Sequence, residues 1–167
     1  MMALIRDGRL VEDQFVGVAD DGEMPDQGPV IVSLARWQSE SEQLLRRGTP
    51  VGVRLKSDEH PEVIAGELGQ LAVVALEFPV FRDGRAYSYA RLLRDRYGFE
   101  GEVRAIGDVL LEQLHYMERV GFNAFEFDSD DPERAFRIAS EDFSAWYQPA
   151  ADRRATVAQL RSKKRPT

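Results

Sequence analysis

Residues 71–108 read LAVVALEFPVFRDGRAYSYARLLRDRYGFEGEVRAIGD, and this stretch decides the fold. It begins with an unbroken apolar run, 72–76, of the kind found in a central parallel strand covered on both faces. After an Arg-Asp-Gly-Arg loop, a helix is expected over residues 88–97. It should end at Gly98, the residue type typical of the position just past a helix C-terminus. A second strand over residues 102–106 completes a strand–helix–strand unit.

The same unit recurs along the chain. Strands are predicted over residues 30–34, 51–55, 71–78, 102–106 and 124–127. Helices are predicted over residues 39–47 and 88–97, and from Pro61, Asp108 and Asp131 onward. Such alternation, about five times at roughly 20–25-residue intervals, predicts an α/β fold with a mainly parallel sheet flanked by helices. Both a flavodoxin-like open sheet and a (β/α) half-barrel fit, and periodicity does not separate them.

The two ends of the chain differ from this repeat. Asp7-Gly8 lies between short apolar runs and predicts an N-terminal β-hairpin, which a loop extends to residue 29. A length of 167 residues favours one domain. We therefore expect a single α/β domain over residues 1–150 and a basic C-terminal tail over residues 151–167, solvated and frayed.

Composition excludes several kinds of function. The chain has no cysteine and two histidines, so it can hold neither a disulfide nor a cysteine-ligated metal, and we predict no metal site. The tail carries six basic residues against Asp152, a net charge of +5. The total is −7, so the first 150 residues carry −12. An acidic body disfavours nucleic acid. No cofactor motif is evident, and without a membrane segment or secretory signal we expect a cytoplasmic protein.

The loops after strands 71–78 and 102–106 should meet at the carboxyl edge of the sheet, where α/β proteins bind ligands. An arginine pair beside a helix N-terminus suits an anion such as sulfate, phosphate or a carboxylate. The predicted anion-binding residues are Arg82, Asp83, Gly84, Arg85, Tyr87, Ser88, Arg104, Gly107 and Asp108. The alternative is a structural one, in which these arginines pair with neighbouring carboxylates and tie two loops together.

Other arginines in the stretch have separate explanations. Arg104 interrupts an apolar strand and, if buried, needs a carboxylate partner, for which Glu77 and Asp108 are candidates. Asp108 should also cap the following helix. We expect Arg91, Arg94 and Arg96 to lie on a solvated helix face or a partner surface.

Three blocks of the sequence resemble one bacterial family. They are residues 81–94, residues 101–110, and Gln113-Leu114 with residues 121–125, in order and spacing, within a resemblance that spans roughly residues 30–140. The family is domain of unknown function 934, whose members are described as probable oxidoreductases involved in sulfite reduction. A cysteine that the family often carries before its Gly-Phe-Asp block is Val120 in this chain.

The resemblance implies a role in assimilatory sulfate and sulfite reduction. The first hypothesis is an accessory protein that acts with the sulfite reductase haemoprotein or its electron donor, for which an acidic body is suited. The second is an enzyme or binding protein that holds a sulfated or phosphorylated small molecule at Arg82, Arg85 and Asp108. The third is a structural homodimer that packs through Trp146 and Tyr147. The sequence assigns no reaction, ligand or oligomeric state; an oxidoreductase component is implied by resemblance alone.

Overall fold

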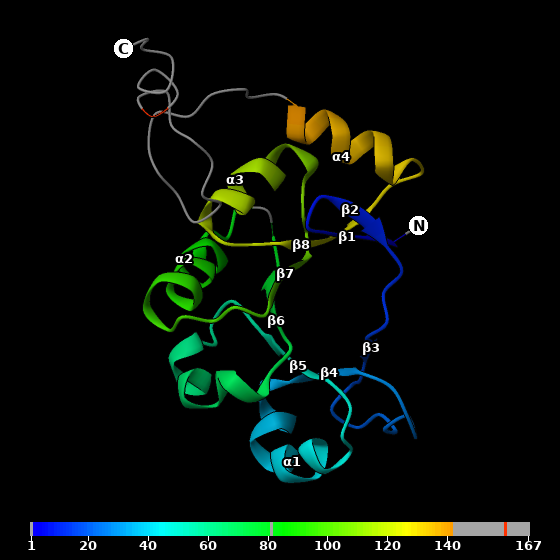
Figure 1. Ribbon diagram of the computed structural model, residues 1–167, viewed down its shortest axis with the longest axis vertical. Coiled ribbons are helices and arrows are strands. Elements are labelled where there is room, and N and C mark those ends of the chain that lie inside the picture. Colours follow the sequence, from blue (N-terminus) through cyan, green and yellow to red (C-terminus); the bar gives the residue numbers. More distant parts are fainter. Residues whose placement is uncertain (1, 81, 142–158, 160–167) are drawn as a thin grey trace, which may run out of the picture.

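The computed structural model of the chain, which describes residues 2–80, 82–141 and 159, is built on an eight-stranded sheet (Figure 1). The predicted basic tail and the contact through Trp146 and Tyr147 lie outside the described residues, apart from Gln159. The strands are β1 (Met2–Arg6), β2 (Arg9–Val11), β3 (Val16–Gly17), β4 (Val30–Ser33), β5 (Val51–Leu55), β6 (Val73–Phe78), β7 (Glu102–Gly107) and β8 (Ala124–Asp128). The α-helices are α1 (Leu34–Arg46), α2 (Arg85–Arg91), α3 (Leu114–Val120) and α4 (Pro132–Glu141). The shorter helical segments are η1 (Pro61–Gln70), η2 (Leu92–Arg96) and η3 (Leu111–Gln113).

The strand order settles which α/β architecture the chain adopts. It is β2-β1-β8-β7-β6-β5-β4-β3, in which β3 to β8 run parallel and β1 is antiparallel to both of its neighbours. Strands β4 to β8 follow one another in space as they do in sequence, whereas a flavodoxin-like sheet reverses its order partway. Successive right-handed crossovers without a reversal put their helices on one face. The fold is therefore a (β/α) half-barrel, one of the two architectures that the sequence left open, with the predicted N-terminal hairpin as β1 and β2.

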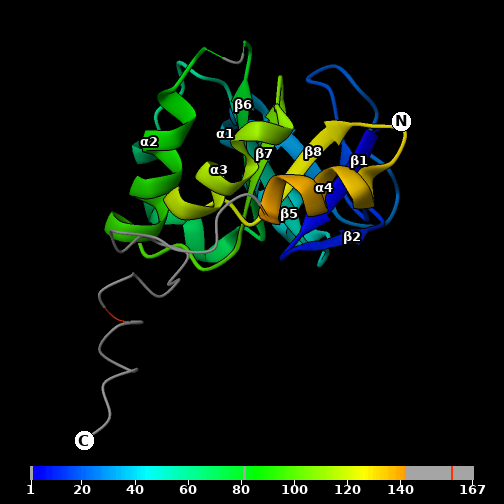
Figure 2. The same ribbon diagram turned by 90° about the horizontal axis from the view of Figure 1, so that it is seen from above.

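The sheet must be strongly curled, because its two edge strands are consecutive in the chain. Residues 12–15 alone join β2 to β3. Five residue steps reach at most about 17 Å, whereas eight strands spaced about 4.8 Å apart in a flat sheet would separate the edges by about 34 Å. The connecting segment therefore crosses the concave side of the sheet, opposite α2 and α3 (Figures 1 and 2).

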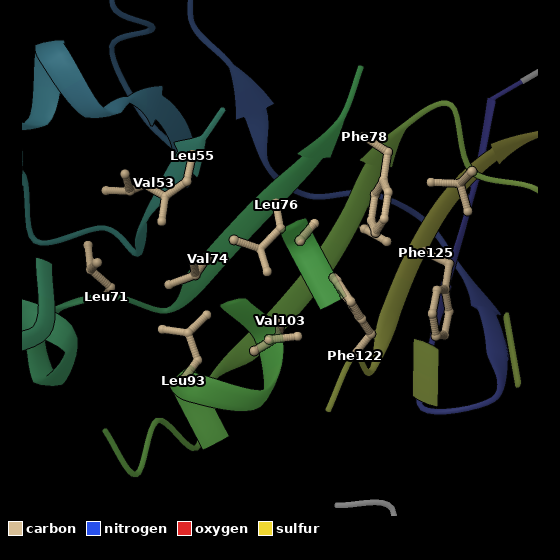
Figure 3. Packing of buried hydrophobic residues seen from close by; sticks show 14 of the residues in the cluster. Val53, Leu55, Leu71, Val74, Leu76, Phe78, Leu93, Val103, Phe122 and Phe125 are labelled. Carbon is tan, nitrogen blue, oxygen red and sulfur yellow. The ribbon is translucent and has the colours of Figure 1, made fainter. Parts of the chain in front are cut away.

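Alternation along each strand divides the sheet into an apolar and a polar face. Side chains such as Val53, Leu76, Val103 and Phe125 are at most 1% exposed and form the core with Leu93 and other helix residues (Figure 3). The intervening positions of β5 to β8 point to the concave face. Several of these are charged: Arg54, Glu77, Glu102, Arg104 and Glu126.

Helix boundaries differ from the predictions in three places. The helix predicted over residues 88–97 already starts at Arg85, as α2. The first helix starts at Leu34, not residue 39, because the Ser33 hydroxyl accepts the Arg36 N–H at 3.1 Å and caps it. The prediction that Asp108 caps a helix is wrong. The left-handed Gly107 (φ 88°) and the extended Leu110 keep the chain turning until η3 begins at residue 111.

Candidate functional site

The carboxyl edge of the parallel strands is strongly acidic. Its loops comprise residues 18–23, 56–60, 79–84, 108–110 and 129–131, and they contain nine Asp and Glu residues against Lys56 and Arg82, with Arg85 just inside α2. The loops at the opposite edge, residues 7–8, 24–29, 47–50, 71–72, 97–101 and 121–123, contain three carboxylates and one arginine. The negative charge of the chain is thus concentrated where α/β proteins place their binding surfaces.

Arg85 is the cation at the centre of this edge. Its Nη2 donates to Asp83 Oδ2 at 2.6 Å and to Ser57 Oγ at 2.9 Å, and its Nε donates to Asp83 Oδ1 at 3.0 Å. This fork lowers the pKa of the Asp83 carboxyl well below its usual range, and the same hydrogen bond raises the pKa of Arg85. The arginine ties the β6–α2 loop to the β5–η1 loop.

Two aromatic rings continue the Arg85 cluster. Tyr89 donates its hydroxyl to the Ser57 carbonyl at 3.0 Å, and the His60 ring meets it edge-on, with ring centroids 5.2 Å apart. His60 Nδ1 accepts the Glu62 N–H and so caps η1. Sequence reasoning missed Ser57 and Tyr89, since contacts across 28 and 32 residues leave no local signal.

The remaining residues that were predicted to bind an anion at this edge differ in how far they are exposed. Tyr87 packs edge-on against Phe78 at 5.3 Å between centroids, and burial raises the pKa of its hydroxyl. Arg82, Ser88 and Asp108 are exposed. Of the two predicted glycines, Gly84 precedes α2 in an ordinary conformation, whereas a Cβ on Gly107 would lie 2.4 Å from a backbone oxygen of β6.

Arg104 does not belong with Arg85. It lies mid-strand in β7 and faces the concave side, where it is 1% exposed. It donates to Glu102 at 2.6 Å, Asp13 at 2.7 Å and Glu126 at 2.9 Å. Burial alone would lower its pKa, but these carboxylates raise it overall. The prediction of a carboxylate partner is confirmed, but the two named candidates are wrong.

Those two candidates are engaged elsewhere. Glu77 lies 3.9 Å from Arg54 on β5, and Asp108 N–H donates to the Phe78 carbonyl at the end of β6. Asp13, which does pair with Arg104, lies 91 residues away in the segment that crosses the concave face. Folding of that segment across the sheet brings the two side chains together.

Arg94 also differs from its prediction. Its guanidinium donates to the carbonyls of Gly121, Phe99 and Gly101 at 2.7–2.9 Å and to Asn123 Oδ1 at 3.1 Å. Burial lowers its pKa. It is a half-buried connector of the loops before β7 and β8, so placing it on a solvated face or partner surface was wrong. Arg91, by contrast, is exposed and pairs with Asp95 at 3.1 Å.

Taken together, these features define a (β/α) half-barrel with an acidic carboxyl edge and a polar concave face. The chain belongs to the family of bacterial proteins of unknown function called DUF934, whose model matches residues 52–158. No curated protein matches the chain. The matched range includes the Arg85 cluster, β7 and β8, but it begins after the crossing segment that supplies Asp13.

The lengths and hydropathies of the described helices fall short of those that a membrane-spanning helix requires. Over the part of the chain that the structure describes, none is both long and apolar enough to cross a bilayer. Within the same residues, no group of three His, Asp or Glu side chains is placed to hold a metal ion.

Proposed function

We propose that the chain is an accessory protein of assimilatory sulfite reduction, and that its acidic carboxyl edge docks on a basic surface of the sulfite reductase haemoprotein or of its electron donor. The observation that carries the proposal is the difference in charge between the two edges of the sheet. The loops of the carboxyl edge contain nine carboxylates and two cations, whereas those of the opposite edge contain three carboxylates and one cation. The link to sulfite reduction rests on the family resemblance.

Charge complementarity explains how such an edge would act. Opposite potentials steer two proteins into an orientation that presents the matching faces, and they raise the association rate more than the final affinity. In this proposal the partners carry the redox chemistry. The half-barrel supplies a rigid platform, because its acidic loops are anchored by contacts such as Arg85 to Ser57 and Arg36 to the Ala19 and Gly22 carbonyls.

The proposal is tested by capture of the purified sulfite reductase haemoprotein, and separately of its electron donor, on the immobilised chain. We expect binding of one of them at about 0.1 M salt and its loss at about 1 M, since this change shortens the Debye length from about 10 Å to about 3 Å. Capture of neither protein at low salt would refute the accessory role.

A second candidate function is the binding of a small sulfated or phosphorylated molecule at Arg85. The observation that favours it is that Arg85 Nη1 makes no hydrogen bond to any residue that the structure describes, while its side chain is 54% exposed. The nearby Asp83 carboxylate opposes it. Sulfate and phosphate should raise the melting temperature of the wild-type chain but not of Arg85→Gln; equal shifts in both would eliminate this candidate.

A further inference from the structure

The concave side of the half-barrel contains a hollow that overlaps the acidic carboxyl edge only in the loop of residues 18–23. It lies between the sheet and the crossing segment and measures about 660 Å³. Cavities of about 300–1,000 Å³ are typical for small molecules. Its lining includes Phe15, Val18, Ile31 and Ile106 as apolar walls.

The two arginines that line this hollow differ in how much of their hydrogen-bonding capacity is used. Arg104 is surrounded by three carboxylates at 2.6–2.9 Å and is 1% exposed. Arg54 is 43% exposed, and its single ion pair is a long one, 3.9 Å from Glu77. Its guanidinium makes no hydrogen bond to any other described residue, so it offers donors for an oxyanion.

A carboxylate from the loop after β3 is hydrogen-bonded to the strand next to Arg54. Ser33 of β4 is the register partner of Arg54, and its hydroxyl donates to Asp20 Oδ1. The second oxygen of Asp20 accepts no hydrogen bond from the described residues. Asp21 lines the same hollow. The Ser33 hydroxyl on the neighbouring strand therefore holds the Asp20 carboxylate, which comes from the loop after β3, at the same hollow as the Arg54 guanidinium.

We infer that the hollow binds a small zwitterion of the amino-acid class. The acid group of this ligand pairs with the Arg54 guanidinium, its ammonium group pairs with the Asp20 carboxylate, and its apolar part packs against Phe15 and Ile106. A ligand with two acid groups is disfavoured because Asp20 and Asp21 would repel the second. The assignment concerns the concave face and is independent of the Arg85 cluster.

The experiment is a titration of the full-length chain with each of the twenty standard α-amino acids, followed by calorimetry and by amide chemical shifts. We expect saturable binding of at least one, with shifts at Phe15 and Ile106. Arg54→Gln and Asp20→Asn should each weaken it about tenfold or more, which is the loss of one charge-assisted hydrogen bond. Arg46→Gln, which changes an arginine 78% exposed on α1, should leave it unchanged.

Several outcomes would overturn the assignment. The first is the absence of saturable binding for every amino acid, and the second is unchanged affinity in a folded Arg54→Gln variant. Equal affinity for the corresponding carboxylic acid without its amino group would show that Asp20 plays no part. Thermal unfolding of each variant checks that it is folded.

Discussion

Replacement of Arg104 by Met tests the internal support of the half-barrel. The substitution keeps much of the side-chain volume but removes the charge shared by Glu102, Asp13 and Glu126. The side chain of Glu102 is 7% exposed, so its carboxylate would be left buried without its closest partner. Breaking a buried ion pair in this way costs about 3–5 kcal/mol. The other two carboxylates are 34% and 28% exposed and add little, since solvent screens them.

The expected result is therefore a loss of about 3–5 kcal/mol in the free energy of unfolding, measured by guanidinium denaturation. For a chain of this size, each kcal/mol lowers the melting temperature by about 2–4 °C, so a fall of about 6–20 °C should accompany it. Addition of Glu102→Gln to Arg104→Met should restore part of the stability at neutral pH.

A matched control is Arg46→Met, which removes a 3.4 Å ion pair on the solvated face of α1. An exposed pair of that kind contributes about 0.5 kcal/mol or less. The reasoning is refuted if Arg104→Met costs less than about 1 kcal/mol.

Three further predictions concern single positions. Gly107→Ala should destabilise the fold by about 2 kcal/mol or more, because φ is 88° and the new Cβ would lie 2.4 Å from a carbonyl oxygen. In the control variant Gly66→Ala the new Cβ meets no atom within 4 Å, so this change should cost far less when the two are compared by chemical denaturation. Because Arg85 lowers the pKa of Asp83 in the folded state, that carboxylate contributes stability that is fully present above its unfolded pKa of about 3.9 and is lost as the pH falls below it. Melting curves of Asp83→Asn should accordingly differ from wild type at neutral pH and converge with it in acid; a constant difference would contradict the pairing. Arg94→Met should lower the free energy of unfolding by about 2–4 kcal/mol and increase hydrogen exchange in the loops before β7 and β8, because it leaves the carbonyls that Arg94 binds without a donor. Unchanged hydrogen exchange in these loops would contradict the role of Arg94 as a connector.

Much of the fold was predictable because its signals are local. The unbroken apolar run of β6, the Asp7-Gly8 turn and the Asp131-Pro132 helix start each depend on neighbouring residues, and all appear in the structure. The choice between an open sheet and a half-barrel was not predictable, because both produce the same strand–helix period. Strand order decides it, and strand order is a property of long-range pairing.

The site shows the same division between local and long-range signals. The proximity of Asp83 to Arg85 was evident from the sequence, whereas Ser57 and Tyr89 meet across loops separated by about thirty residues. Ser33 did carry a local signal, a hydroxyl directly before a helix, which the prediction of a later start overlooked. Arg104 was recognisable as a buried cation, but its partner Asp13 depends on a connection that crosses the sheet.

The most direct measurement of the central claim is the affinity of the sulfite reductase haemoprotein, and of its electron donor, for two charge-reversed variants at about 0.1 M salt. Asp58→Lys/Asp130→Lys alters the carboxyl edge, and Asp26→Lys/Glu100→Lys makes the same change of charge at the opposite edge, at residues that are all exposed. Docking through the acidic edge predicts a loss of about tenfold or more for the first variant, mostly in the association rate, and little change for the second. Equal affinities for the two variants would contradict the account.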